Sequence, residues 1–413
     1  MQVLILILFA TFASAKVVVD EASLDEKLGS SPELQEYVRR FESAQKLQGH
    51  LLRSFLPKVG LSYGQEKFST GPYEGVTQSY GGIQAEINLF NSGRDRLEGR
   101  KRNVEAESAK VDTKITRAKI LAELRKSLAH FAYLSEMEEI LQEALKLTET
   151  SAKDARKRIN AGLATKTDLL DFKQQTIQIN QELQNLRFEK GVARRMIATL
   201  LGYAPTEELE IRYKNSHPEH GQEEKLTRPS EKNLLVKKAK LLTEVAQIES
   251  TKASRWWAPE VELYGYALRF TQKEREYPDG DDRNDLTVGI KIELPIFDGG
   301  NSIAESRARA LLARAQSKHL LGRKLEVERD TLDAMMKLDL AHGLIHGAEE
   351  NVEVMEKYRQ GIKGEYAKGV KNSPDVLQAS QRWISARENF AEVKKNYQFA
   401  KADALYLMNL AGK

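Results

Sequence analysis

Hydrophobic and polar residues alternate with a period of two in two short stretches of the chain. Residues 286–296 place an aliphatic side chain at every second position, and polar or charged residues stand between most of them. Residues 83–89 repeat the pattern. A period of two predicts strands with two different faces. A candidate partner strand precedes each stretch, so we expect strand hairpins over residues 59–90 and 260–297.

Long stretches with helical periodicity follow each strand hairpin. No proline occurs from 94 to 204, and no glycine occurs between Gly99 and Gly162. A helix of that length extends about 100 Å. Further on, apolar residues alternate at spacings of three and four, as in a coiled-coil heptad. They include Leu169, Phe172, Ile179, Leu183 and Ile197, and later Val376, Ala379, Trp383, Ala386 and Phe390. We expect helical hairpins over 94–201 and 301–410.

The two halves of the chain repeat each other when the sequence is shifted by 207 residues. Gly82-Ile83 falls on Gly289-Ile290, and Asp168-Leu169 falls on Asp375-Val376. Self-similarity of this kind indicates two copies of one structural unit. We therefore predict a first repeat over residues 16–202 and a second over 230–413. The polar segment 203–229 between them is a linker with some local structure.

The N-terminus resembles an export signal. Val3 to Phe12 is apolar, and Ala13-Ser14-Ala15 offers the small residues that signal peptidase requires. The alternative is a buried N-terminal strand or helix. We expect residues 1–15 to be a signal peptide. The chain has no cysteine. Because no stretch of 18 apolar residues follows, strands must carry the chain if it crosses a membrane.

Charge and motifs argue against several functions. The chain of 413 residues has 64 Lys and Arg and 60 Asp and Glu, a balance without the excess that nucleic-acid binding requires. His342 and His346 are four residues apart, but no HExxH motif occurs. Phosphate-binding loops and the GxSxG motif of hydrolases are also missing. We expect no enzyme activity, no cofactor and no metal.

The strand hairpins allow two interpretations. An aliphatic face opposite a polar face suits a soluble sandwich or a transmembrane barrel with lipid outside and water inside. Four strands cannot close a barrel, and an open edge in lipid leaves backbone groups without partners. Three copies would supply twelve strands. Rival functions are a periplasmic coiled-coil adaptor or tether without channel activity and an exported hydrolase on a helical scaffold.

Three features resemble the TolC-like outer-membrane efflux proteins. They are the strand-to-helix junctions at residues 88–94 and 294–300, the hairpin tips at 161–168 and 368–375, and the tandem layout itself. The resemblance implies a mainly α fold with a small β part. Coiled-coil hairpins form an α-barrel, and each chain adds four strands to a trimeric transmembrane β-barrel.

The resemblance also implies a function. A homotrimer lies in the outer membrane of a Gram-negative-type bacterium, in contact with its lipid, and extends into the periplasm. It is the passive exit duct of a tripartite efflux pump or type I secretion system. It works with a periplasmic adaptor and an inner-membrane pump and binds no nucleic acid. Family members export drugs, small toxic molecules or unfolded proteins.

The resemblance assigns roles to residues at the two hairpin tips. The tip and adaptor contacts are Gly162, Leu163, Thr167, Gly369 and Val370. The periplasmic gate comprises Asp168, Tyr366, Lys371, Asp375 and Gln378, in which the tyrosine and Lys371 hold the pore shut by reaching the first hairpin or a neighbouring subunit. Lys371 stands where the family has arginine, and Gln378 where it has a second aspartate. The plainer interpretation is a turn after which Thr167 or Ser373, with Asp168 or Asp375, caps the returning helix.

Overall fold

The computed structural model describes residues 17–21, 23–67, 69, 77–162, 165–216, 233–273 and 283–411. They form two compact units. Unit 1 contains the chain up to Tyr37, Thr113–Leu234 and the chain from Glu326 onward, and unit 2 contains Val38–Asp112 and Leu235–Leu325. The expected signal peptide, residues 1–15, lies outside the described residues.

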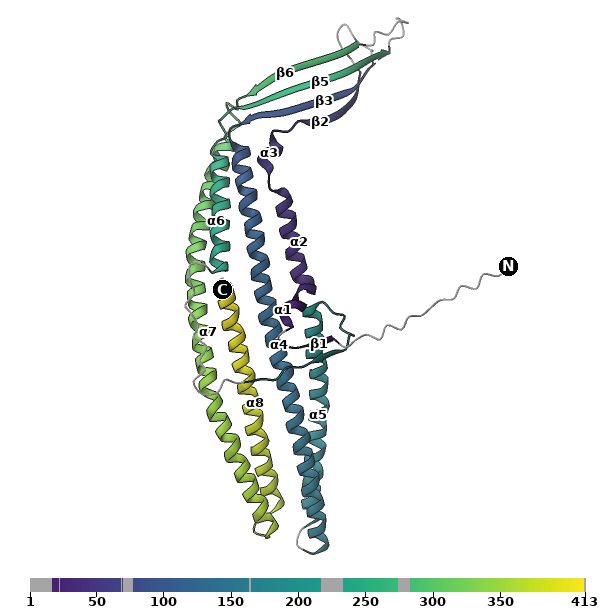
Figure 1. Ribbon diagram of the computed structural model, residues 1–413, viewed down its shortest axis with the longest axis vertical. Helices are drawn as coiled ribbons and strands as arrows, with labels where there is room; N and C mark the ends of the chain where they lie inside the picture. The colour runs from purple at the N-terminus through teal and green to yellow at the C-terminus, as the bar shows by residue number, and fades with distance from the viewer. Residues whose placement is uncertain are drawn as a thin grey trace, which may run out of the picture. The chain divides into compact units, whose positions relative to one another are not determined.

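Unit 2 carries one antiparallel sheet. It consists of β2 (Lys58–Lys67), β3 (Thr77–Asn91), β5 (Glu260–Lys273) and β6 (Arg283–Glu293). The strand order is β2-β3-β5-β6 (Figure 1), so the two hairpins meet where β3 pairs with β5. Strands β2 and β6 are the outer strands, and each has a single neighbour within the sheet. Among the described residues, no further strand pairs with the far side of either, so both edges can take another strand.

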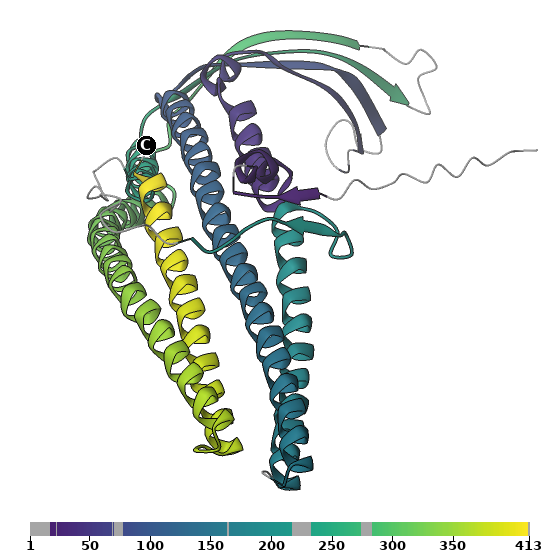
Figure 2. The same ribbon diagram turned by 60° about the horizontal axis from the view of Figure 1, so that its bottom comes forward.

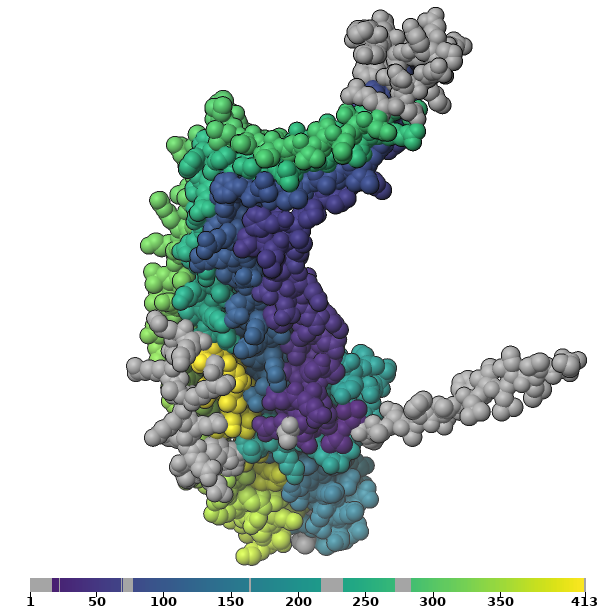
Figure 3. Space-filling view, turned by 45° about the horizontal axis from the view of Figure 1, so that its top comes forward, coloured from purple at the N-terminus to yellow at the C-terminus, as the bar shows by residue number. Residues whose placement is uncertain are grey.

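Aliphatic side chains of the outer strands are strongly exposed. On β6, Leu286 and Val288 are 80% and 73% exposed, and on β2 Leu61 is 86% exposed. Figure 3 shows the four strands as one continuous band, from β6 in green to β2 in purple-blue. The predicted alternation to Ile296 extends past the strand, which ends at Glu293. Pro295 has no N–H to donate to a ladder, which accounts for the earlier end.

Two long helical hairpins follow the two strand hairpins. The long helices α4 (Arg94–Asn160) and α7 (Asn301–Ala367) have 67 residues each. The returning helices are α5 (Lys166–Leu201) and α8 (Ser373–Leu410). Within unit 1, Figures 1 and 2 show each returning helix antiparallel to its long helix. The start of α7 follows the start of α4 by 207 residues (301 against 94), as does that of α8 after α5 (373 against 166). This confirms the mainly α fold with tandem repeats.

The heptad positions form the core of the hairpins in unit 1. Phe172, Ile179 and Leu183 of α5 are buried, as are Ala379 and Trp383 of α8. One cluster joins three helices, with Met137, Ile140, Leu141 and Ala144 of α4 against Ile179 and Leu183 of α5 and Trp383, Ile384 and Ala391 of α8. Burial of large apolar side chains contributes roughly 1.5–3 kcal/mol each. The same residues therefore hold the first hairpin together and attach α8 of the second hairpin to it.

Short elements complete the described chain. Strand β1 (Val17–Val19) pairs in parallel with β4 (Leu209–Ile211), which lies in the segment predicted as a linker. The remaining elements are α1 (Leu24–Lys27), the 3-10 helix η1 (Leu28–Ser30), α2 (Pro32–Leu47), α3 (His50–Ser54) and α6 (Leu234–Ala253). Among the helices of the described residues, none has the length and apolarity needed to cross a membrane.

The end of the first helical hairpin depends on Gly202. This residue caps α5 with φ +83°, a left-handed conformation that glycine adopts without strain. A Cβ atom there would meet the carbonyl oxygen of Ser30 at 2.4 Å. We predict that Gly202→Ala lowers the free energy of unfolding by about 1–3 kcal/mol. Thermal unfolding followed by circular dichroism measures the effect, and Gly191→Ala, at a helical glycine with no close backbone neighbour, is the control.

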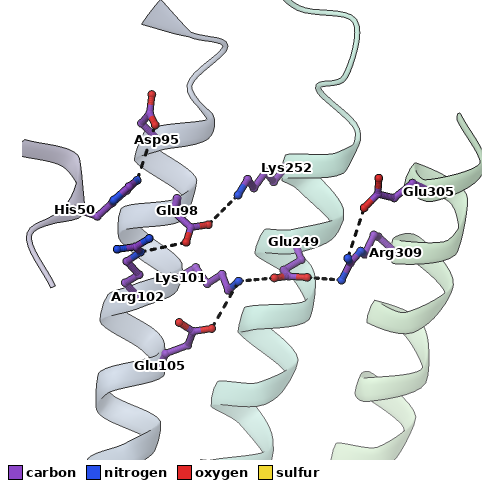
Figure 4. A network of polar contacts seen from close by, with 10 residues as sticks. All are labelled: His50, Asp95, Glu98, Lys101, Arg102, Glu105, Glu249, Lys252, Glu305 and Arg309. Atoms are coloured by element: carbon purple, nitrogen blue, oxygen red, sulfur yellow. Dashed lines mark hydrogen bonds and ion pairs between the residues drawn. The ribbon is translucent and has the colours of Figure 1, made fainter. Parts of the chain in front are cut away.

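An ion-pair network joins three helices of unit 2 below the sheet (Figure 4). Glu98 of α4 accepts hydrogen bonds from Arg102 at 3.1 Å and from Lys252 of α6 at 2.8 Å. Lys101 of α4 and Arg309 of α7 both contact Glu249 of α6 at 2.5 Å. Carboxylates thus lie between cations of neighbouring helices, which ties α4, α6 and α7 together.

The network makes unit 2 sensitive to acid. Burial of Glu98 opposes its ionisation, but hydrogen bonds from Lys252 and Arg102 outweigh burial and lower the pKa of Glu98 from 4.5 to about 2. A lowered pKa in the folded state stabilises the protein above the unfolded pKa, and that stabilisation is lost as pH falls from about 4.5 to 2. We predict that Glu98→Gln destabilises the protein at pH 7 by about 1–3 kcal/mol and flattens the loss of stability below pH 4.5. Urea unfolding at several pH values tests this.

Candidate functional site

Each helical hairpin turns at a glycine in the left-handed conformation. Gly162 follows α4 with φ +74°, and Gly369 follows α7 with φ +79°. A side chain at such a position is strained, so glycine ends the long helix at these points. Among the predicted tip residues, Val370 is 71% exposed, while Leu163 lies outside the described residues. Both turns are thus built in the same way, 207 residues apart.

The returning helices begin with capping boxes that differ from the expected caps. The N-caps are Thr165 and Asn372, not Thr167 and Ser373, which lie inside the helices. The backbone N–H of Thr165 donates to Asp168 at 2.8 Å, and the N–H of Asn372 donates to Asp375 at 3.1 Å. An aspartate three residues after the N-cap can close such a box. Asp168 and Asp375 therefore cap the returning helices as predicted. Their partners are Thr165, two residues before the predicted Thr167, and Asn372, one residue before the predicted Ser373.

Four side chains from four helix ends meet at the two tips, and we call them the tip cluster: Arg158 of α4, Asp168 of α5, Tyr366 of α7 and Ser373 of α8. The guanidinium of Arg158 lies over the Tyr366 ring, 4.3 Å from its centroid, and also donates to the Tyr366 carbonyl oxygen. The Tyr366 hydroxyl lies 3.4 Å from the Ser373 hydroxyl. The cluster therefore joins the first hairpin to the second.

The tip cluster has a buried half, Tyr366 and Ser373, and a partly buried charged half, Arg158 and Asp168. Tyr366 is 7% exposed and packs with Ala155, Phe172, Ile362, Val376 and Ala379. Burial alone would raise the pKa of Asp168. Hydrogen bonds from Thr165 and Ser373 and the positive charge of Arg158 have a larger, opposite effect, so the pKa of Asp168 lies below its usual value. The carbonyl that receives Arg158 is at the C-terminal end of α7, where the helix dipole favours a cation. Asp168 is thus held ionised beside a partly buried guanidinium.

The other predicted gate residues make no comparable contact. Among the described residues, Lys371 has no hydrogen bond or ion pair with the first hairpin. Asp375 is engaged in the capping box of its own helix, and Gln378 is exposed. The gate roles of all five residues remain predictions. Tyr366 and Asp168 both neighbour Ser373 at the tip, and the guanidinium that reaches Tyr366 belongs to Arg158 of the first hairpin.

A groove lies beside the first tip. It has a volume of about 520 Å³ and runs between α4 and α5. Its lining combines Leu169 and Ile177 with the cations Lys153, Arg156 and Lys173. An apolar groove with a cationic rim suits a helical partner that carries apolar and acidic side chains. Within the described part of the chain, by contrast, no group of three histidine or acidic side chains is arranged to hold a metal.

Neither the role of Arg158 nor the groove could be identified from the sequence. The guanidinium of Arg158 reaches Tyr366, 208 residues away in sequence, and only packing brings them together. One indirect signal existed, because lysine replaces the expected arginine at position 371 and a latch would then need a cation from elsewhere. The groove residues lie at intervals of three and four along two helices, which also describes ordinary solvent-exposed helix faces.

Comparison with known proteins agrees with this architecture. A relative of known function is the outer membrane protein TolC of Vibrio cholerae serotype O1, 21% identical over 189 residues. That match covers 45% of this chain and 43% of the relative, so the chain matches less than half of the relative's length.

Solved structures match over nearly the whole chain. The outer membrane protein VceC of Vibrio cholerae superposes with a TM-score of 0.74 at 18% identity, over 95% of this chain and 96% of that one. The CmeC outer membrane channel of Campylobacter jejuni gives 0.79 at 16% identity, over 94% and 85%. The family model described as Outer membrane efflux protein matches residues 23–203 and 229–411. The chain therefore belongs to the outer membrane efflux protein family and is a protein of the outer membrane.

Proposed function

We propose that the protein is a passive exit duct, closed from three copies of the chain and gated at the periplasmic tips of its helical hairpins. It performs no catalysis itself. A periplasmic adaptor and an inner-membrane pump supply the cargo and the energy. One combination of features carries the proposal. The described sheet has two outer strands with exposed aliphatic side chains, and the two helical hairpins contact each other at their tips.

The sheet edges support a trimer. In the described part of the chain, β2 and β6 each have one neighbouring strand, and their aliphatic side chains are exposed as a lipid-facing surface requires. In hydrocarbon each unpaired backbone group costs several kcal/mol, so an open edge is not tolerated there. Pairing β6 of one copy with β2 of the next removes every edge, and three copies close a barrel of twelve strands. Barrels of eight or more strands are stable in membranes.

The tip cluster supports a duct that is closed at rest. Arg158, Tyr366, Asp168 and Ser373 hold the two hairpins of one chain together by stacking, hydrogen bonds and charge. Opening a bore at the tips requires the hairpins to separate, so these contacts oppose opening. An adaptor that binds near the groove at Lys153 and Leu169 would change the balance by favouring the separated state.

Reconstitution tests the proposal. The full chain is purified from outer membranes in detergent, cross-linked to establish its oligomeric state, and added to planar bilayers for single-channel recording. We expect a trimer with a small conductance and rare openings. A soluble monomer without conductance would instead favour a periplasmic adaptor or tether. Trimers that hydrolyse esters or peptides in the absence of a pump would contradict the passive role.

A further inference from the structure

A polar cavity lies in unit 2, where the helices meet the strands. It has a volume of about 270 Å³ and is lined by the start of α4, the end of α6 and the first turns of α7. The cations that line it are Arg94, Lys252 and Arg309, the carboxylates are Glu249 and Glu305, and Trp256 adds an aromatic wall. The lining itself has three cations and two carboxylates, and two further carboxylates just outside it, Glu98 and Glu260, pair with Lys252 and Arg94.

The cations of the cavity keep hydrogen-bond donors in reserve. Arg94 uses one terminal nitrogen for Glu260 at 2.8 Å, whereas its buried Nε atom has no hydrogen-bond partner among the described residues. Lys252 donates to Glu98 at 2.8 Å, and an ammonium group has three donors. Arg309 contacts Glu249 and Glu305 through its two terminal nitrogens, as Figure 4 shows. A ligand with several acceptor oxygens can use the remaining donors without breaking these pairs.

The cavity borders the surface that faces lipid in the proposed barrel. Arg94 follows the last residue of β3 by three positions, and its partner Glu260 is the first residue of β5. Trp256 stands four residues before β5, at most about 14 Å from it along the chain. The neighbouring Trp257 is 61% exposed. Aromatic side chains are enriched at the boundary between headgroups and hydrocarbon, so the cavity is at the depth of phosphate groups.

We propose that this cavity binds the phosphate of a membrane phospholipid headgroup, with the acyl chains lying along the aliphatic faces of the strands. Arg94, Lys252 and Arg309 donate to the phosphate oxygens. A cation with several donors binds phosphate through short charge-assisted hydrogen bonds. A bound lipid also anchors the point where strands become helices. The proposal rests on the membrane placement of the sheet in the proposed function.

Lipid binding is measured on the trimer in phospholipid-free dodecyl maltoside by native mass spectrometry. The probes are dihexanoylphosphatidylglycerol, inorganic phosphate and dihexanoylglycerol, which has the same tails without the phosphate. Arg309→Gln should weaken binding of the phospholipid at least fivefold. Glu305→Gln removes a carboxylate from an exposed position and should tighten it about twofold. Lys318→Gln, at an exposed lysine on the same helix, is the matched control and should have no effect.

Each outcome of this experiment either supports or overturns the lipid site. Stronger binding of the phospholipid than of either other probe, with opposite effects of the two cavity variants, supports the site. Equal binding of the phospholipid and dihexanoylglycerol, or identical affinity in all variants, overturns it. Binding of inorganic phosphate alone also overturns it, since a free anion would then be the ligand. Conductance is recorded on the same preparation, so a conducting trimer without lipid binding refutes only this inference, whereas a monomer without conductance refutes the proposed function.

Discussion

The Arg158→Ala variant is expected to open far more often than the wild-type channel in planar bilayers. Arg158 stacks on the buried ring of Tyr366 and donates to its carbonyl oxygen. A partly desolvated cation–π contact contributes about 1–2 kcal/mol, and a hydrogen bond from a charged donor contributes about 1.5–3. Discounting for the partial exposure of the site, we expect a loss of about 1.5–3 kcal/mol per chain. That corresponds to a ratio of separated to latched hairpins on the order of 10- to 100-fold higher in each of the three chains.

A neighbouring residue provides a matched control for this variant. Lys157 precedes Arg158 on α4, but its side chain is 80% exposed and its ion pair, with Asp154, is within the same helix. Lys157→Ala removes one positive charge from the same turn and should leave opening unchanged. Tyr366→Phe keeps the ring and removes the hydroxyl that faces Ser373, so an intermediate effect is expected. Identical open probabilities for Arg158→Ala and Lys157→Ala would refute the role of Arg158 in the latch.

The regular parts of the fold could be predicted from the sequence because their physical cause is periodic. The length of α4 follows from the absence of proline between Arg94 and Asn160 and of glycine after Gly99. The heptad positions are buried because a spacing of 3.5 residues keeps one helix face against its partner. Two of the strands follow from alternation with a period of two, and the other two were predicted as the partners that precede them. The repeat then transfers each observation from one half of the chain to the other.

The helix caps, the strand ends and the contacts between hairpins could not be predicted from the sequence, because they depend on local chemistry and tertiary packing. The cap of α5 is Thr165, two residues before the expected Thr167, because several hydroxyl side chains compete for the same orphan amides. Strand β6 ends at Glu293 because Pro295 has no N–H to donate to the ladder. The alternation of apolar residues continues past this proline to Ile296, so it predicted a longer strand. The contact between Arg158 and Tyr366 depends on how two hairpins pack, and no spacing within either hairpin encodes it. Patterns thus predicted the elements, and packing decided which side chains meet at the tips.

A charge on the aliphatic face of β6 is expected to abolish assembly in the outer membrane. Val288 is the central residue of β6 and is 73% exposed on the aliphatic face. Arginine facing lipid at the middle of a transmembrane barrel costs about 2–4 kcal/mol. A closed barrel of three chains would carry the substitution three times, roughly 6–12 kcal/mol in all, which approaches the stability of a typical domain. Val288→Arg should therefore yield no trimer in the outer-membrane fraction when membranes are separated on sucrose gradients and the chain is detected by immunoblot.

The adjacent position separates a membrane barrel from a soluble sheet. Thr287 precedes Val288 in β6, and its side chain points to the opposite face because strand residues alternate. In a water-filled barrel the Thr287→Arg side chain faces solvent, so trimers should form at near wild-type levels. In a soluble sandwich the aliphatic face would be buried under protein, and Val288→Arg would unfold the chain in solution. Two results would contradict lipid contact at Val288: a folded, water-soluble Val288→Arg protein, or an equal loss of trimer for both variants. Arginine at these neighbouring positions has unequal effects only if one face of the strand contacts hydrocarbon and the other contacts water.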